Sequence, residues 1–393
     1  MLHICLGGYY TDNWSYQDNL LPKELQSKGV ENIIITTTSS FDGKYKGVKK
    51  TISYFLDGIK VIRIPATKNR FRNFFYSYNI FKLICKEKPD CIFVHGVQVC
   101  SGVYAVKYKK KVNKDCVLLS DNHAIFVNSP IKQDFIHKFL YSIRNKKIRR
   151  CCREYDAIWG VTPECIDYFE RVFNISSKGI ELLPLGHSVS QNDLKDASSI
   201  KSQLRSKHNI PSDSVVLITG GKISDEKKTI ELITAFKMIK RENVYLFVFG
   251  RVETSDYEDS LLKEIGDLLN KRVFMLGELS VDDYTKYYLS SDMAVFPGGQ
   301  SVLWQQAIGC GLPLILDKQQ NVDYLDVGGN VCFANDSNPQ SILNAINLCL
   351  NENHFKEMAM VARTKGYDFF SYSRIADTVI NKYYEVCNEN KSR

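Results

Sequence analysis

The stretch "FPGGQSVLWQQAIGCGLPLILD", residues 296–317, decides the fold of the second half of the chain. It indicates a strand end, a glycine turn, a short helix and a second strand. The Gly298–Gly299 pair allows a ligand to approach the backbone closely, and the hydroxyl of Ser301 is suited to cap a helix that starts near it. Free N–H groups and the helix dipole at that start favour a phosphate group. The alternative is an ordinary capped helix.

Apolar runs separated by helical segments recur along the whole chain. Most are continuous rather than alternating, which is typical of strands buried on both faces of a parallel sheet. They cover 2–7, 31–37, 58–65, 90–96, 115–121, 157–162 and 180–186 in the first half, and 214–221, 244–250, 272–279, 293–298, 312–317 and 330–335 in the second. Two rounds of strand–helix alternation predict an α/β protein with two doubly wound Rossmann-like domains, which we expect to face a central cleft.

A polar, serine-rich stretch at 188–213 marks the predicted domain boundary. We expect an N-terminal domain at 1–190, a linker at 191–212 and a C-terminal domain at 213–366. No apolar run of 18 residues predicts a transmembrane helix, and the N-terminus predicts no signal peptide. The 12 cysteines include no Cys-x-x-Cys pattern, so we expect reduced thiols in a cytoplasmic protein rather than disulfides or a metal site.

The net charge of +8 is unevenly distributed. Residues 1–190 hold 29 Lys and Arg against 17 Asp and Glu, and the remainder holds 23 against 27. The surplus is concentrated at 66–88, 104–114 and 135–153, where basic and apolar or aromatic residues are mixed. This mixture suits peripheral contact with an anionic membrane. Nucleic acid is the rival partner, but we find no nucleic-acid-binding signature and expect none. A solubilising basic face is the third alternative.

Several segments, in the right order, resemble the group 1 (family 4-like) retaining glycosyltransferases of GT-B architecture. "GGKISDEKKTIELITAF" (220–236) resembles that family's Gly-Arg-x-x-x-Glu-Lys-Gly segment, with Gly221, Lys222 and Lys227 at the glycine, arginine and lysine. "LPLGHS" (183–188), "VFGR" (248–251), "MLGEL" (275–279) and the opening stretch resemble further segments. The resemblance implies two facing domains, with a C-terminal helix at 367–393 that packs back on the first.

The resemblance also implies where a nucleotide-sugar donor would bind. Lys222 and Lys227 would act catalytically by neutralising the leaving diphosphate as point charges; the alternative is a pair of solvated surface lysines. The implied donor-binding residues are Gly8, Gly221, Arg251, Gly277, Leu279, Gly298, Gly299, Gln300, Ser301, Val302 and Gln306.

The chain departs from the family at one important place. The family usually has two glutamates, eight positions apart, around the glycine turn, and here Gly298 and Gln306 take their places. A glutamine can still accept a hydrogen bond from a ribose hydroxyl and can also donate one. The sugar hydroxyls would then be recognised by Gln300, Gln305 or backbone amides. A catalytically degenerate nucleotide-binding protein is therefore the alternative to an active enzyme.

The first domain would hold the acceptor. The loop "GGYYTDNWSYQDNLLPKEL" (7–25) resembles the family's first loop, and its acceptor candidates are Tyr10, Asn13, Tyr16 and Asn19, together with Asp121 beyond the fifth strand. The alternative is that they serve as cap and packing residues.

The resemblance implies that His123 is catalytic, near the reacting carbon of the sugar. His95 and His187 are its rivals.

The reaction expected is transfer of a sugar, with retention, from a nucleoside diphosphate sugar to a glycan or polyprenyl-diphosphate-linked acceptor in bacterial cell-surface polysaccharide synthesis. No Asp-x-Asp motif occurs, so we expect neither metal nor cofactor. The chain lacks Gly-x-Gly-x-x-Gly, which disfavours an NAD oxidoreductase. An epimerase of the same architecture would need acid–base carboxylates, which we do not find.

Overall fold

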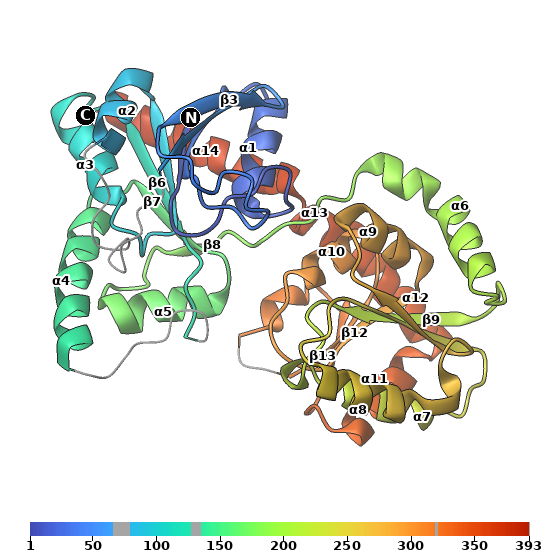
Figure 1. The fold of residues 1–393 in the computed structure, drawn as a ribbon. Helices are drawn as coiled ribbons and strands as arrows, with labels where there is room; N and C mark the ends of the chain where they lie inside the picture. Colours follow the sequence, from blue (N-terminus) through green and yellow to red (C-terminus); the bar gives the residue numbers. More distant parts are fainter. Residues whose placement is uncertain (66–78, 127–134, 319–320, 393) are drawn as a thin grey trace. The chain divides into compact units, whose positions relative to one another are not determined.

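The computed structural model describes residues 1–65, 79–126, 135–318 and 321–392, and the chain divides into two compact units (Figure 1). The first unit consists of residues 1–185 and the segment from residue 372 onward, and the second consists of residues 186–371. Each unit is built around one sheet with helices on both faces, which confirms the predicted α/β class with two doubly wound domains. None of the described helices is both long and apolar enough to cross a bilayer.

The first unit contains a sheet of order β3-β4-β2-β1-β5-β6-β7-β8, parallel except for β3. Its strands are β1 (Leu2–Cys5), β2 (Ile33–Thr37), β3 (Ile52–Leu56), β4 (Ile59–Ile64), β5 (Cys91–His95), β6 (Val117–Asn122), β7 (Ala157–Gly160) and β8 (Glu181–Leu182). Its helices are α1 (Gln17–Ser27), α2 (Asn79–Glu87), α3 (Gly102–Lys111), α4 (Phe135–Cys152), α5 (Pro163–Phe173) and α14 (Tyr372–Lys391), and α14 packs beside α1.

The second unit contains a fully parallel sheet of order β11-β10-β9-β12-β13-β14. Its strands are β9 (Val215–Gly220), β10 (Val244–Phe249), β11 (Val273–Gly277), β12 (Met293–Phe296), β13 (Leu314–Asp317) and β14 (Val331–Ala334). Its α-helices are α6 (Gln191–Lys207), α7 (Thr229–Lys237), α8 (Ser255–Ile265), α9 (Val281–Ser290), α10 (Leu303–Gly309), α11 (Pro339–Cys349), α12 (Glu352–Val361) and α13 (Tyr367–Phe369). Short 3-10 turns occupy Asp225–Lys227, Gly266–Leu268 and Asp323–Leu325, and a π turn occupies Ala362–Gly366.

The predicted linker at 191–212 is wrong, because most of it forms α6. Ser190 caps this helix: its hydroxyl accepts from the backbone N–H of Asp193, whose carboxylate accepts from Ser190 in return. Apolar residues at helical spacing, including Leu194 and Leu204, pack against the second core. Arg205 is buried and pairs with Asp292 at 2.7 Å. The segment is therefore an integral helix of the second unit rather than a connection.

Adjacent residues of one strand bury their side chains in different cores, as expected for strands covered on both faces. In β10, Phe247 and Phe249 pack on one side of the sheet, whereas Leu246 and Val248 pack on the other. The 12 cysteines are free thiols, most of them buried.

Candidate functional site

A row of polar side chains lies at the carboxyl edge of the first sheet. His95 ends β5, and its Nδ1 lies 3.0 Å from Oδ2 of Asp121 in β6. The other oxygen of Asp121 accepts from the N–H of Gly96 at 2.7 Å. On the side of Asp121 that is nearer to the surface, His123 Nε2 forms an ion pair with its carboxylate at 3.2 Å. Asp121 is fully buried, whereas 31% of the His123 side chain is exposed. His123 is therefore the member of this group that reaches the surface.

Behind His95, the hydrogen bonds continue to His3 and Asn32, and they indicate which histidine nitrogens carry a hydrogen. His3 Nε2 lies 3.0 Å from the Asn32 side-chain oxygen, which can only accept, so this nitrogen carries a hydrogen. His3 Nδ1 is then the acceptor, and it lies 3.0 Å from His95 Nε2. Since His95 also donates from Nδ1 to Asp121, both of its nitrogens are protonated.

The neighbouring charges shift the pKa values in the same sense as this proton assignment, against the effect of burial. Burial alone would lower the pKa of His123, but the adjacent Asp121 carboxylate outweighs it and raises the pKa to about 9. The pKa of His95 is raised in the same way, by Asp121 and Asp18 against burial. Burial raises the pKa of Asp121, yet the two imidazolium groups hold it well below its usual range. His123 is thus a cationic hydrogen-bond donor near neutral pH rather than a base.

Two groups among the described residues have the spacing of metal ligands, which the sequence did not reveal. They are His95, Asp121 and His123, and Cys5, Asp18 and His95, with ligand atoms within 4.8 Å of one another. In the first group, His95 and His123 form ion pairs with Asp121 at 3.0 and 3.2 Å. Burial raises the pKa of the Cys5 thiol well above its usual value, which disfavours the thiolate that a metal needs.

The predicted acceptor residues are divided between interior and surface. Tyr10 is only 3% exposed, and the guanidinium of Arg63 lies 5.2 Å above its ring. Asn19 donates to the Thr11 carbonyl at 3.0 Å, which holds the loop to the start of α1. Asn13 is exposed, with a left-handed φ of 61°.

The exposed part of the first loop forms an aromatic cluster with the loop after β2. The Trp14 ring stacks on Phe41 with centroids 4.8 Å apart and an interplanar angle of 6°. Tyr9 lies 4.9 Å from Phe41, and Tyr16 lies 5.3 Å from Trp14. All four side chains are between 38% and 54% exposed. Of these residues only Tyr16 was identified from the sequence. Gly8, just before the cluster, is exposed with open space around it.

A buried cation anchors both loops of this cluster. Arg63 is completely buried and donates to the carbonyls of Tyr10 at 3.0 Å and Thr37 at 2.8 Å. It also pairs with Asp12 at 2.8 Å, and Asp12 accepts from the Tyr45 hydroxyl. Because these bonds join the loops after β1 and β2 to β4, the aromatic cluster has a rigid base.

In the second unit, the two predicted catalytic lysines have different surroundings. Lys222 lies in the loop after β9, is 59% exposed and pairs with Glu253. Lys227 ends the 3-10 turn that precedes α7, and its ammonium donates to the Gln300 carbonyl. Lys227 is partly buried, and this burial lowers the pKa of its ammonium group.

The glycine turn after β12 packs directly on the lysine turn. A Cβ at Gly298 would overlap the Glu226 carbonyl oxygen, and one at Gly299, where φ is 52°, would lie 2.8 Å from the Lys227 ammonium. Glycine is therefore needed here for contact between two loops of the protein, as well as for any approach of a ligand.

The helix after this turn begins at Leu303, close to the predicted start near Ser301. The Ser301 hydroxyl accepts from the N–H of Leu303 at 3.2 Å, and Val302 between them has helical dihedral angles, so this bond is of the kind that an N-cap residue makes. Val302 is 56% exposed at the helix start.

Four of the predicted residues line one shallow hollow, namely Lys222, Lys227, Gly298 and Ser301. Its volume is about 10 Å³, room for no more than a water molecule, so a ligand would lie over it. Other predicted donor residues of the second unit do not line the hollow: Gly221 follows β9, the Arg251 carbonyl accepts from Ile223, the Gly277 carbonyl accepts from Gly250, and Leu279 packs against the core.

Gln306, the predicted ribose contact, is hydrogen-bonded to other residues of the second unit. It is 6% exposed, and its side-chain oxygen accepts from the N–H of Ser188 at 3.0 Å. Its NH₂ donates to the Thr285 hydroxyl at 2.9 Å. Contact with a ribose would require these bonds to break. Gln305 is also buried and donates to the Tyr324 hydroxyl at 3.2 Å.

His187 is a packing residue of the second unit. Its Nε2 lies 2.8 Å from the Tyr367 carbonyl, and its ring lies against Gly309 so closely that a Cβ there would overlap it. Burial lowers its pKa to about 4, so the ring is neutral. This environment favours His123 over His187 as the reactive histidine.

Comparison with known proteins bears on the function. Residues 200–368 match the family model described as glycosyl transferases group 1. Over 219 residues the chain is 25% identical to the lipopolysaccharide 1,2-N-acetylglucosaminetransferase of Salmonella typhimurium. The alignment covers 51% of the chain and 55% of that protein, so the chain spans about half the length of this curated relative.

Solved structures resemble the whole chain in fold. A glycosyltransferase from Rickettsia africae has a TM-score of 0.71 at 15% identity, covering 98% of this chain and 97% of its own. Sucrose-phosphate synthase from Thermosynechococcus elongatus has a TM-score of 0.66 at 16% identity, covering 98% of each chain. The Anabaena protein HepE in complex with UDP has a TM-score of 0.67 at 15% identity, covering 98% of this chain and all of that one.

Proposed function

We propose that the protein transfers a sugar from a nucleotide-sugar to a saccharide-bearing acceptor, because residues 200–368 match the group 1 glycosyl transferase family model and the chain resembles glycosyltransferases in fold. One observation carries this proposal: the half-buried ammonium of Lys227 lies against the Gly298–Gly299 turn inside the matched region. A diphosphate lying over this turn would find positive charge there.

The donor diphosphate is proposed to lie over the hollow between the two lysines. Lys227 would give up its bond to the Gln300 carbonyl, and Lys222 would exchange Glu253 for a phosphate oxygen. Both charges would then act where negative charge develops on the leaving group, which is often the largest catalytic effect. One such contact contributes roughly 3–4 kcal/mol. In this proposal the lysines do the work that a metal does in other transferases.

His123 is proposed to act at the sugar that is transferred. Its raised pKa keeps it protonated near neutral pH, so it would donate a hydrogen bond rather than abstract a proton. Asp121 would hold the ring and its charge, with His95 behind it. We infer retention of configuration from the family, with displacement on one face of the sugar as its route.

We propose a glycan or polyprenyl-diphosphate-linked oligosaccharide as the acceptor, in bacterial cell-surface polysaccharide synthesis. The Salmonella relative, which by its name acts on lipopolysaccharide, supports this class. The aromatic cluster of Tyr9, Trp14, Tyr16 and Phe41 supports it as well, because flat, exposed rings can pack against the apolar face of a sugar ring.

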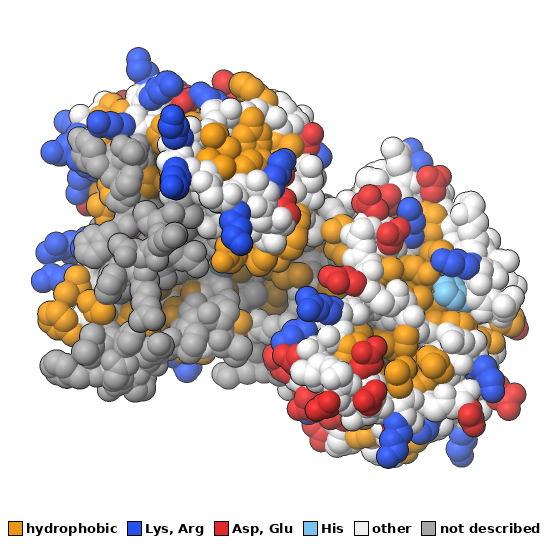
Figure 2. Space-filling model, viewed as in Figure 1, with side chains coloured by type: hydrophobic (Ala, Val, Ile, Leu, Met, Phe, Trp, Pro, Cys, Tyr) orange, Lys and Arg blue, Asp and Glu red, His pale blue; other side chains and the backbone are white. Residues whose placement is uncertain are grey.

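We further propose that the protein works at the inner face of the cytoplasmic membrane. Two of the three basic stretches, 104–114 and 135–153, coincide with α3 and α4, whereas residues 66–78 of the third lie outside the described residues. In Figure 2, lysine and arginine side chains are frequent over the first unit, and acidic side chains gather on the second.

The direct test is turnover with a panel of nucleotide-sugars, measured as donor hydrolysis and as transfer to glycan acceptors. UDP-N-acetylhexosamines are the first donors to test, because the Salmonella relative is named for N-acetylglucosamine. Lys227→Ala should lower turnover by about 10²–10³-fold. Unchanged turnover in this variant would remove the main catalytic assignment. Lys240→Ala, at an exposed position beyond α7, is the matched control.

A catalytically degenerate nucleotide-binding protein is the second candidate. The observation that favours it is Gln306, whose amide is bonded to Ser188 and Thr285 where the family usually has a glutamate that meets the ribose. Thermal stabilisation by UDP or GDP, without transfer from any donor of the panel, would favour this candidate over the enzyme.

A further inference from the structure

A carboxylate lies at the glycine turn after β12, although the chain lacks both of the family's usual glutamates there. A Cβ at Gly299 would lie 3.0 Å from Oε1 of Glu226 and 2.8 Å from the ammonium group of Lys227. Glu226 is the middle residue of the 3-10 turn Asp225–Lys227, and it is exposed. A carboxylate and an ammonium group are therefore both within reach of a ligand that lies over Gly299.

The backbone of Glu226 also explains why residue 298 has no side chain. A Cβ at Gly298 would overlap the Glu226 carbonyl oxygen and would lie 2.8 Å from Cγ of Lys228. A glutamate at position 298, which the family usually has, would need the lysine turn to move away. The same packing of two loops thus excludes a carboxylate at residue 298 and brings the Glu226 carboxylate to residue 299.

Two neighbouring carboxylates are already paired with lysines. Asp225 lies 3.4 Å from the ammonium group of Lys228, and Glu253 pairs with Lys222. Glu226 differs from both, because its carboxylate lies against the backbone of the glycine turn. Of these three acidic residues, Glu226 is therefore the one placed to meet a ligand over that turn.

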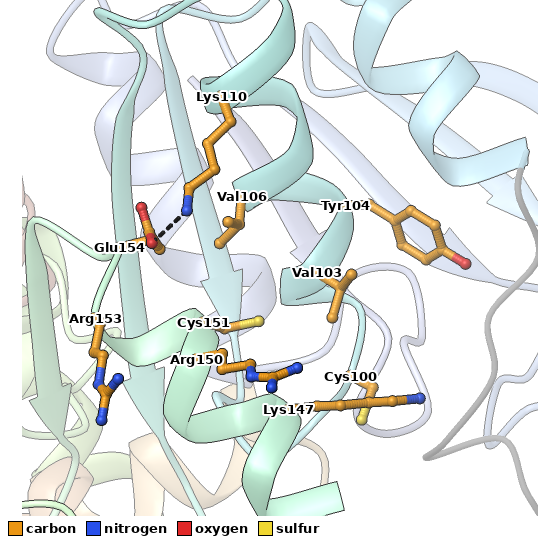
Figure 3. A pocket seen from close by; sticks show the side chains of 10 residues that line it. All are labelled: Cys100, Val103, Tyr104, Val106, Lys110, Lys147, Arg150, Cys151, Arg153 and Glu154. Atoms are coloured by element: carbon orange, nitrogen blue, oxygen red, sulfur yellow. Dashed lines mark hydrogen bonds and ion pairs between the residues drawn. The ribbon is translucent and has the colours of Figure 1, made fainter.

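A cavity of about 490 Å³ in the first unit has the volume of a small-molecule site but not the lining that a sugar needs (Figure 3). It lies between α3 and α4, and most of its lining is apolar or basic. Its carboxylate, Glu154, already pairs with Lys110. Since sugar hydroxyls need hydrogen-bond acceptors, this cavity is a poorer place for a donor sugar than the glycine turn.

We propose that Glu226 binds hydroxyl groups of the donor sugar, in place of the glutamate that the family usually has at position 298. The inference rests on the proposed function, because it requires the donor diphosphate to lie against Lys227. The sugar attached to that diphosphate would extend over Gly299, and the two oxygens of an ionised carboxylate can accept hydrogen bonds from hydroxyls on neighbouring carbons. Glu226 is then a specificity-determining residue that contacts the sugar and not the phosphates.

The first test compares the binding of free nucleotides and nucleotide-sugars to the full chain by calorimetric titration. The ligands are UDP, GDP, UDP-N-acetylglucosamine, UDP-glucose, UDP-galactose and GDP-mannose. Glu226→Gln should weaken the nucleotide-sugar that the wild type binds best by about 10- to 100-fold, the effect of losing a hydrogen bond to a charged group. It should leave the free nucleotide within about threefold, or bind it slightly more tightly, because a negative charge beside Lys227 is removed.

The matched control is Asp225→Asn, which makes the same charge change in the same turn at a carboxylate that pairs with Lys228. It should leave both kinds of ligand within about threefold. Equal weakening of nucleotide and nucleotide-sugar by Glu226→Gln would overturn the proposal, because Glu226 would then act on the phosphates through Lys227. An equal loss in Asp225→Asn would overturn it as well, because diffuse charge would explain the effect.

The second test identifies the hydroxyls with 3-deoxy, 4-deoxy and 6-deoxy forms of the same nucleotide-sugar. At least one of these forms should bind the wild type about 10-fold more weakly than the parent, yet bind Glu226→Gln as well as the parent does. If Glu226→Gln weakens the parent and all deoxy forms equally, no hydroxyl contacts Glu226 and the proposal is wrong.

The two proposals fail in different ways. Nucleotide-sugar binding that Glu226→Gln leaves unchanged would refute the role of Glu226 and leave the transferase proposal standing. A wild-type chain that binds none of these nucleotides or nucleotide-sugars would contradict the transferase proposal, and the role of Glu226 with it.

Discussion

The ion pair of Asp121 and His123 makes a quantitative prediction for Asp121→Asn. The variant keeps an oxygen that can accept from the N–H of Gly96, but it loses the negative charge between His95 and His123. The pKa of His123 should fall from about 9 toward the ordinary value of 6.5. That fall in pKa corresponds to about 3 kcal/mol of interaction between the His123 imidazolium and the Asp121 carboxylate. Since 31% of the side chain is exposed, water screens part of it, and about 2 kcal/mol should remain.

The sign of the pH dependence follows from the raised pKa. A histidine with a raised pKa in the folded state stabilises the fold fully below its unfolded pKa, and this contribution is lost as pH rises through the folded value. The wild-type free energy of unfolding should therefore decrease between about pH 6.5 and pH 9 through His123, and the decrease should be smaller in Asp121→Asn.

The assay is an NMR titration of the His123 ring, with urea unfolding at several pH values beside it. Asp18→Asn is the matched control, because Asp18 is partly exposed and lies 3.5 Å from His95 rather than beside His123; it should shift the His123 pKa much less. A His123 pKa that stays near 9 in Asp121→Asn would refute the reasoning, because a group other than the Asp121 carboxylate would then raise the pKa of His123.

Three substitutions in the second unit should change stability as measured by urea unfolding. Gly250→Ala should destabilise by about 3 kcal/mol, because its Cβ would overlap the Gly221 carbonyl at a φ of 127°, and a cost under about 1 kcal/mol would contradict this. Gln306→Ala should cost about 2 kcal/mol by removing the buried bond to the Thr285 hydroxyl and the partly buried bond from the Ser188 N–H, and a neutral effect would mean that water replaces the amide. Lys228→Gly should stabilise by roughly 0.5 kcal/mol, because the native φ of 55° favours glycine, whereas destabilisation would show that its ion pairs matter more.

The sheets could be predicted because buried parallel strands leave continuous apolar runs. Each run that the sequence indicated forms a strand, from β1 at 2–5 to β14 at 331–334. The strand that was missed, β3, alternates between half-buried and exposed residues at the edge of the sheet. It pairs with β4 across an Asp57–Gly58 turn, and both residues have positive φ. Asp-Gly between apolar stretches is a hairpin signal that was available in the sequence.

The donor site could be predicted only in part. The order of the segments placed Lys222, Lys227 and the glycine turn at one hollow. The sequence did not show that Gln306 points inward, because whether a residue on a short helix faces solvent or a neighbour depends on packing. Nor did it show that Lys222 is paired with Glu253, a residue from another loop.

The polar network of the first unit could not be predicted from local pattern. His3 lies inside an apolar run, and its contact with His95 arises because β1 and β5 are neighbours with Cys5 opposite His95. The aromatic cluster joins the loops after β1 and β2 for the same reason. Exposed aromatic residues in both of these loops were the available signal, since loops at the carboxyl ends of adjacent parallel strands meet.

The central claim is that a nucleoside diphosphate binds with its phosphates against Lys227 and the Gly298–Gly299 turn. A crystal structure of the full chain with UDP or GDP tests this most directly. The account predicts phosphate oxygens within hydrogen-bonding distance of the Lys227 ammonium, with Lys222 released from Glu253. A nucleotide bound elsewhere, or this hollow left without ligand at saturating UDP and GDP, would contradict it.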